Sequence, residues 1–157
     1  MIMKNKWVLI TGSSRGLGKD LAIVFAENSF NVIIHGRDRN KLEEVKKEIL
    51  EGNVECEIIE GDLVESNTLD RLEKISKEKE ISVLINNAGY GLKENLVDMS
   101  EKDIDEIVVT NLNSPIKIIK RTISQLGKNE GEIININSVS GLEFQDRRSI
   151  YCAAKWG

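Results

Sequence analysis

Two side chains near the end of the sequence have the types and the spacing of an acid–base pair. Lys155 stands four residues after Tyr151, and residues four apart lie on one face of a helix. A free phenol, with a pKa of about 10, is a poor acid or base at neutral pH, but a nearby ammonium group favours its anion. The other tyrosine, Tyr90, has Glu94 at this spacing. We therefore single out Tyr151 and Lys155 for proton transfer, against the alternative that the pair is only a solvated helix face.

A glycine-rich loop near the start of the chain could hold the phosphates of a nucleotide. From Thr11 to Gly18 the sequence is TGSSRGLG, and glycines let a backbone turn sharply and approach a phosphate. The spacing differs from a Walker loop, because Ser13 occupies the place of its first glycine. It also differs from Gly-x-Gly-x-x-Gly, because Leu21 occupies the place of the last one. Taken alone, the loop fits a dinucleotide site and an ordinary glycine-rich turn equally well.

Short apolar runs alternate with longer segments of helical periodicity, which is the pattern of a parallel sheet covered by helices. The predicted strands are Trp7–Thr11, Asn31–His35, Val54–Ile59, Ile81–Ile85 and Glu132–Asn137. With right-handed crossovers they form an α/β, doubly wound, Rossmann-like parallel sheet of order 3-2-1-4-5 in one domain, residues 1–157. Ligands of such sheets bind beyond the carboxyl ends of the strands, where the candidate motifs stand.

Helix signals separate these strands. A first helix is predicted over Gly16–Ser29, and its apolar face is formed by Leu17, Leu21, Val24 and Phe25. Asp38 can cap the second helix and Ser66 the third. Ser100, followed by Asp103, resembles a capping box that opens one long helical region. The lone histidine, His35, ends the second strand and is expected to pack near the nucleotide rather than to act in catalysis.

The composition excludes several classes of protein. The net charge of −4 and the lack of a Lys/Arg run do not fit nucleic acid or an anionic membrane surface. No apolar stretch approaches the roughly 20 residues that span a bilayer. Cys56 and Cys152 lack metal-ligand spacing, so we expect no metal. Without a signal peptide, the sequence predicts a cytoplasmic protein with reduced thiols.

Taken together, the motifs resemble those of the short-chain dehydrogenase/reductase family in their order and spacing. The matching residues are Thr11-Gly12-x-x-x-Gly16-x-Gly18, Asn86-Asn87-Ala88-Gly89, Asn111, Ser138 and Tyr151-x-x-x-Lys155. The resemblance extends over the whole chain, and it is strongest to the subfamily that includes 3-oxoacyl carrier-protein reductases. It implies an oxidoreductase that transfers a hydride between NADP(H) and a carbonyl or secondary alcohol substrate.

The resemblance also implies a role for each polar residue. Tyr151 would be the general acid or base for the substrate oxygen, and Lys155 would favour the phenolate and hold the nicotinamide ribose. Ser138 would hydrogen-bond the substrate oxygen, with Ser140 as its competitor. Asn111 would hold a water that links Lys155 to solvent.

The cofactor is expected to be NADP rather than NAD. An acidic residue about 20 positions beyond the glycines would select NAD, and Asp38 lies at that distance. In the family, however, the selecting Asp usually stands where this chain has Gly36, so Asp38 is favoured as a helix cap. Arg37 and Arg15 offer guanidinium groups that suit a 2′-phosphate. The expected cofactor contacts are Thr11, Gly12, Ser14, Arg15, Gly16, Leu17, Gly18, Arg37, Asp62, Leu63, Asn86, Ala88, Gly89, Tyr151 and Lys155.

Family members continue beyond the point where this sequence stops. We therefore expect an incomplete domain that lacks the last two strands of the family fold and, in isolation, binds cofactor weakly and turns over little. The full-length form is expected to be a homodimer or homotetramer that acts on a small-molecule carbonyl or alcohol substrate. The alternative is a non-catalytic nucleotide-binding or scaffold remnant. The intact Asn111, Ser138, Tyr151 and Lys155 favour the enzyme.

Overall fold

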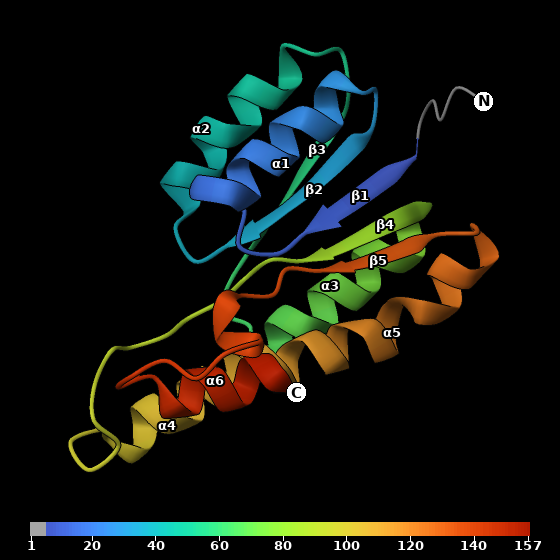
Figure 1. Ribbon diagram of the computed structural model, residues 1–157. Helices are drawn as coiled ribbons and strands as arrows, with labels where there is room; N and C mark the ends of the chain where they lie inside the picture. Colours follow the sequence, from blue (N-terminus) through green and yellow to red (C-terminus); the bar gives the residue numbers. More distant parts are fainter. Residues whose placement is uncertain (1–5) are drawn as a thin grey trace.

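The protein folds around one parallel β-sheet with helices on both faces (Figure 1). The computed structural model describes residues 6–157. The strands are β1 (Trp7–Ile10), β2 (Asn31–Gly36), β3 (Cys56–Glu60), β4 (Ile81–Asn86) and β5 (Glu132–Asn135). They are arranged in the order β3-β2-β1-β4-β5, and all four pairings are parallel. The predicted doubly wound sheet of order 3-2-1-4-5 is confirmed, with strand ends shifted by one or two residues.

The helices divide between the two faces of the sheet (Figure 1). One face is covered by α1 (Gly16–Glu27) and α2 (Arg39–Leu50). The other is covered by α3 (Ser66–Glu78) and α5 (Ser114–Lys128). Near the carboxyl ends of the strands, α4 (Glu101–Val108) packs against α6 (Ser149–Trp156).

The core consists of two apolar layers, one on each side of the sheet. Successive side chains of a strand point to opposite faces, so a strand that is covered on both faces is apolar throughout. In β1, Val8 and Ile10 pack with side chains of α1 and α2, whereas Trp7 and Leu9 pack with side chains of α3 and α5. This is why the central strands β1, β2 and β4 are buried throughout, whereas the edge strands β3 and β5 are only partly buried.

The apolar face predicted for α1 is partly wrong. Leu17 and Val24 are 53% and 50% exposed, and the residues of α1 that are buried are Gly18, Ala22 and Ala26. The physical reason is the close approach of the helix start to the loops. A Cβ atom at Gly18 would overlap the carbonyl oxygen of Gly12 and the side-chain amide of Asn87. Small residues therefore lie closest to the sheet, and Leu17 and Val24 remain outside, whereas Leu21 and Phe25 pack against the core as predicted.

Two of the three predicted helix caps are confirmed. The Asp38 carboxylate accepts the N–H of Lys41 at 3.2 Å. The Ser100 hydroxyl accepts the N–H of Asp103 at 3.1 Å and donates to the Asp103 carboxylate at 2.6 Å. The prediction for Ser66 is wrong, because α3 is preceded by Glu65, which makes no side-chain capping bond.

The long helical region is continuous but changes its geometry in the middle. Between α4 and α5, residues Val109–Asn113 form a π-helical segment. Pro115 has no N–H, so it cannot donate the α-helical bond to the carbonyl of Asn111, four residues earlier. The wider turn therefore occurs at Asn111, one of the predicted catalytic residues, and π-helical turns often occur at functional sites.

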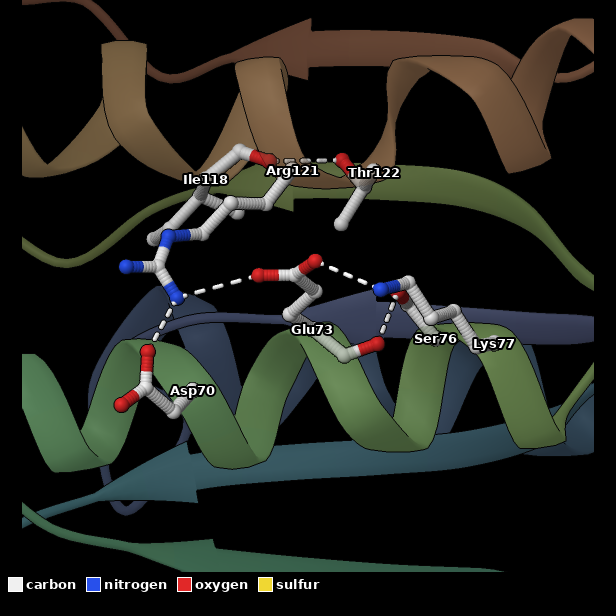
Figure 2. Close-up of polar contacts among 7 residues, drawn as sticks. All are labelled: Asp70, Glu73, Ser76, Lys77, Ile118, Arg121 and Thr122. Carbon is white, nitrogen blue, oxygen red and sulfur yellow. Dashed lines mark hydrogen bonds and ion pairs between the residues drawn. The ribbon is translucent and has the colours of Figure 1, made fainter.

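Charged side chains tie α3 to α5 on the outer surface (Figure 2). Arg121 of α5 donates to the carboxylates of Asp70 at 2.6 Å and Glu73 at 3.2 Å. Lys77 donates to the other oxygen of Glu73 at 2.6 Å. The buried hydroxyl of Thr122 is satisfied within its own helix by the carbonyl of Ile118 at 2.8 Å. The ion pairs of Arg121 thus link the two helices that cover this face.

Candidate functional site

The loops after β1 and β4 are joined by hydrogen bonds from two polar side chains. The Thr11 hydroxyl oxygen accepts the N–H groups of Asn87 at 3.0 Å and Ala88 at 3.1 Å. The Asn87 amide donates to the carbonyls of Thr11 and Gly12, both at 2.9 Å. Thr11 was predicted to contact the cofactor, but its buried side chain is used to hold the two loops together. Asn87 was not among the predicted contacts, although the Asn86–Gly89 motif pointed to it.

The glycine loop adopts a conformation that requires glycine at two positions. Gly12 has a φ of +66° and Gly16 a φ of +54°, in the left-handed region that favours glycine. A Cβ atom at Gly12 would lie only 2.7 Å from the Cα atom of Ala88. The loop after β1 therefore packs backbone to backbone against the loop after β4, and the space in front of the start of α1 stays open.

A groove of about 360 Å³ extends across the carboxyl ends of the strands. The predicted contacts that line it are Gly12, Ser14, Arg15, Gly16, Arg37, Asp62, Leu63, Ala88 and Gly89. Residues that line it without having been predicted as contacts are His35, Gly36, Asn87, Tyr90 and Thr110. Six predicted contacts do not line it: Thr11, Leu17, Gly18, Asn86, Tyr151 and Lys155, of which the last two line a second groove. Asn86 instead donates to the side chain of Asn135 at 2.9 Å and so bridges β4 and β5.

His35 joins three strand ends beneath this groove. Its Nδ1 accepts the N–H of Gly12 at 3.3 Å, and its Nε2 lies 3.1 Å from the carbonyl oxygen of Gly61, to which it donates. Both bonds together require the neutral ring with its proton on Nε2. Burial lowers the pKa of His35 from 6.5 to about 4, which stabilises this neutral form. His35 was expected to pack near the nucleotide, and it lines the groove from below.

Gly36 and Arg37 shape the end of the groove near β2. Gly36 lies against Ser14, whose Cβ and Oγ would both be 3.2 Å from a Cβ atom at Gly36. Arg37, with a 61% exposed side chain, donates through Nη1 to Asp62 at 3.2 Å and to Glu106 at 3.3 Å. The hydrogen bond with Asp62 is the largest cause that raises the pKa of Arg37.

Arg15 and Asp62 also lie at this end of the groove. Arg15 is the N-cap residue of α1, and its exposed side chain makes no capping bond. Asp62 lines the groove and also accepts the N–H of Val64 at 3.2 Å, so it is a turn residue as well. Two guanidinium groups therefore border the groove on the side where a 2′-phosphate was expected.

A second groove, of about 280 Å³, contains the predicted acid–base pair. It is lined by Tyr151 and Lys155 and shares Asn87, Gly89 and Tyr90 with the first groove. The Lys155 ammonium nitrogen lies 5.9 Å from the centre of the Tyr151 ring. Four-residue spacing on α6 thus places both groups in one groove that adjoins the first.

The surroundings of the pair fix its geometry. Lys155 donates to the carbonyl of Ile136 at 2.9 Å, and burial lowers the pKa of its ammonium group. The Tyr151 ring packs on the backbone of Gly91, where a Cβ atom would lie 2.7 Å from the ring. Gly91 was not predicted, and its lack of a side chain is what lets the loop after β4 approach the phenol.

Asn111 lines neither groove but bonds to the backbone of Tyr90, which lines both. Its amide nitrogen donates to the carbonyls of Tyr90 at 2.5 Å and Ile107 at 2.8 Å, and its oxygen accepts the N–H of Tyr90 at 3.3 Å. A Cβ atom at Gly89 would lie 3.1 Å from this oxygen and 3.9 Å from the Lys155 nitrogen. The side chain of Asn111 therefore holds the loop that carries Tyr90, and its role in binding a water stays a prediction.

The two candidate serines have different surroundings. Ser138 begins a short 3-10 turn, Val139–Gly141, and its hydroxyl oxygen accepts the N–H of Ser140 at 3.2 Å. Ser140 is fully buried and donates to the side chain of Gln145 at 2.7 Å. Ser138 is partly exposed, although it is not among the residues that line either groove. The hydroxyl of Ser140 is thus engaged inside the protein, which favours Ser138 of the two.

Three further features of the described residues concern metal ligands, membrane-spanning helices and cysteines. Between residues 6 and 157, no three His, Cys, Asp or Glu side chains are grouped so that they could hold a metal ion. Within the same range, every helix is too short or too polar to cross a membrane. Cys56 and Cys152 are buried and free, and burial raises the pKa of Cys56 to about 12.

The chain is similar in sequence to bacterial reductases. The 3-oxoacyl-(acyl-carrier-protein) reductase of Staphylococcus epidermidis is 32% identical over 157 residues, which are 98% of this chain and 64% of that protein. The corresponding reductase of Staphylococcus aureus is 31% identical over 97% of this chain and 63% of that protein. The chain thus spans a little less than two thirds of the length of these relatives.

Solved structures of similar proteins superpose closely on this chain. A metagenomic short-chain oxidoreductase in complex with NADP has a TM-score of 0.93 at 28% identity, over 100% of this chain and 73% of that one. The bulky-bulky ketone specific alcohol dehydrogenase from Comamonas testosteroni has a TM-score of 0.91 at 30% identity, over 96% and 62%. The family model described as short chain dehydrogenase matches residues 6–157. The chain belongs to the short chain dehydrogenase family.

Proposed function

We propose that this chain carries the nucleotide-binding and proton-transfer parts of an NADP(H)-dependent oxidoreductase that acts on a carbonyl or secondary alcohol. One observation carries the proposal. The groove across the strand ends and the groove of Tyr151 and Lys155 adjoin, because Asn87, Gly89 and Tyr90 line both. A dinucleotide long enough to occupy the first groove would bring its far end beside the acid–base pair, which is what hydride transfer coupled to proton transfer needs.

The residues of the first groove fit a dinucleotide. Gly12 packs directly against Ala88, no atom lies within 4 Å of a Cβ atom placed at Gly16, and the start of α1 offers N–H groups that bind phosphate. Arg15 and Arg37 would bind the 2′-phosphate, and Asp62 with Leu63 would contact the adenine. The metagenomic relative was solved with NADP and the Sphingobium yanoikuyae short-chain dehydrogenase, 28% identical, with NADPH, which supports NADP over NAD.

The second groove would perform the proton chemistry. When bound, NADPH supplies a hydride to the carbonyl carbon and becomes NADP⁺, and the reverse reaction returns it. Tyr151 donates its phenol proton to the carbonyl oxygen as that oxygen gains the electron pair of the broken π bond. The Lys155 ammonium stabilises the phenolate that results, and its lowered pKa favours passing a proton on. Ser138 would orient the substrate oxygen, and Asn111 would keep the loop of Tyr90 in place.

The test is the substitution Tyr151→Phe in the full-length form of the protein, where it removes the hydroxyl and keeps the ring. We expect it to abolish NADPH-dependent reduction of a panel of ketones, while NADPH binding, followed by its fluorescence, stays unchanged. Binding by the same variant is the control for correct folding. Turnover by Tyr151→Phe at the rate of the unsubstituted chain would rule out the proposed role.

A further inference from the structure

The groove beside Tyr151 is positively charged although the chain as a whole is negative. Its charged lining residues are Arg148 and Lys155, and no Asp or Glu lines it. The net charge of the sequence is −4. A concave site lined by charge of one sign attracts ligands of the opposite sign more strongly than scattered surface charges do.

Lys155 is already engaged, whereas Arg148 is not. The Lys155 ammonium donates to the carbonyl of Ile136 and lies 5.9 Å from the Tyr151 ring centre. The guanidinium carbon of Arg148 lies 6.0 Å from the same ring centre. Among the residues that the structure describes, no carboxylate pairs with Arg148. Its neighbour Arg147, in contrast, is exposed and pairs with Asp146 at 3.4 Å.

The backbone holds Arg148 firmly at this place. It is the residue directly before α6, and its carbonyl accepts the N–H of Cys152 at 2.8 Å in the first turn of that helix. The backbone of Arg148 therefore lies at a fixed place beside the turn of α6 that carries Tyr151. The distance of 6.0 Å is at the limit of a cation–π interaction, so the Tyr151 ring is only a weak partner for the charge of Arg148.

We propose that the substrate is an oxo acid or hydroxy acid whose carboxylate binds to Arg148 while its oxygen at the reacting carbon binds to Tyr151. The planar guanidinium fork matches a carboxylate in two hydrogen bonds. This inference rests on the proposed function, since it names the substrate class of the same site. Arg148 then determines specificity, and it takes no part in the proton or hydride transfer.

The experiment compares an acid with its neutral ester. NADPH-dependent reduction of acetoacetate and of methyl acetoacetate is measured for the unsubstituted chain, for Arg148→Gln and for Arg147→Gln. We expect the unsubstituted chain to prefer acetoacetate. Arg148→Gln should raise the KM for acetoacetate about ten- to a hundredfold, with little change in kcat and little change in either constant for the ester. Arg147→Gln, the matched control, should leave both substrates unchanged. Equal losses on both substrates, or a preference of the unsubstituted chain for the ester, would overturn the proposal.

A binding measurement separates this proposal from the proposed function. Titration calorimetry with 3-hydroxybutyrate and its methyl ester, in the presence of NADP⁺, does not require turnover. If neither oxo compound is reduced but Arg148→Gln still loses the binding of 3-hydroxybutyrate, the proposed reductase function is wrong and the proposed carboxylate site is supported. If the acid binds Arg148→Gln as tightly as the unsubstituted chain, the anion site fails whether or not the chain is a reductase.

Discussion

His35 shows how one buried side chain can make the nucleotide groove sensitive to acid. It is 2% exposed and bonds to Gly12 and Gly61 only in its neutral form. Burial is the largest cause that lowers its pKa to about 4, opposed by the bond to Gly61 and by Asp62, while Arg71 lowers it further. The unfolded chain therefore binds a proton below about pH 6.5 that the folded chain does not take up until about pH 4.

We expect the free energy of unfolding to fall as the pH is lowered through this window. The neutral histidine contributes fully above pH 6.5, and up to about 3 kcal/mol is lost by pH 4. Urea unfolding measured at several pH values between these limits checks the slope. Carboxylates also titrate there, so His35→Gln, which cannot take up the proton, serves as the reference. If the two chains lose stability in parallel, His35 is not the group responsible.

At the scale of residues, the motifs predicted the types of the site residues better than their roles. Thr11 and Asn111 were assigned to cofactor and water, yet both side chains bond to the backbone of neighbouring loops. A hydroxyl or amide that holds a loop and one that holds a ligand have the same donors and acceptors. Only the fold decides between these partners, and so a motif alone could not distinguish the two roles.

The start of α1 illustrates the same limit at the scale of elements. Periodicity placed the large residues Leu17 and Val24 on the buried face, because it counts apolarity and ignores the distance between helix and loop. In the fold that distance leaves room only for Gly18. The π-helical turn at Val109–Asn113 was likewise outside the reach of periodicity, although Pro115 marked the missing N–H.

Two glycine substitutions test the close packing of α1. Gly18→Ala should lower the melting temperature and weaken NADPH binding, since the new methyl group overlaps the Gly12 carbonyl and the Asn87 amide. Gly127→Ala is the matched control. Gly127 lies in α5 with no atom within 4 Å of an added Cβ, so the same change should stabilise the protein by up to about 1 kcal/mol. Thermal unfolding with and without NADPH measures both, and a Gly18→Ala chain as stable as the unsubstituted one would contradict the packing argument.

At the scale of the whole molecule, the strand order was predictable because general rules restrict it. Alternating strands and helices require parallel pairing, and right-handed crossovers with a reversal at the first strand lead to β3-β2-β1-β4-β5. The order reverses between the paired strands β1 and β4, which leaves a crevice beyond their carboxyl ends, and the glycine loop and the Asn86–Gly89 loop meet there. Topology thus predicted where the site lies. It could not predict the charges of the second groove, because these depend on how α6 packs in the fold.

The exposed side of α5 leads to the last prediction, that copies of this chain associate through that helix. Ile116 and Ile123 are 56% and 53% exposed, and residues seven apart lie on the same side of a helix. Ile123→Glu would place a charge in such an interface and should convert a dimer or tetramer to monomers. Val24→Glu is the matched control, because Val24 is 50% exposed on α1, on the opposite face of the sheet (Figure 1). Sedimentation velocity over a range of concentrations distinguishes the species. Association that survives in Ile123→Glu, or that is lost equally in Val24→Glu, would place the interface elsewhere.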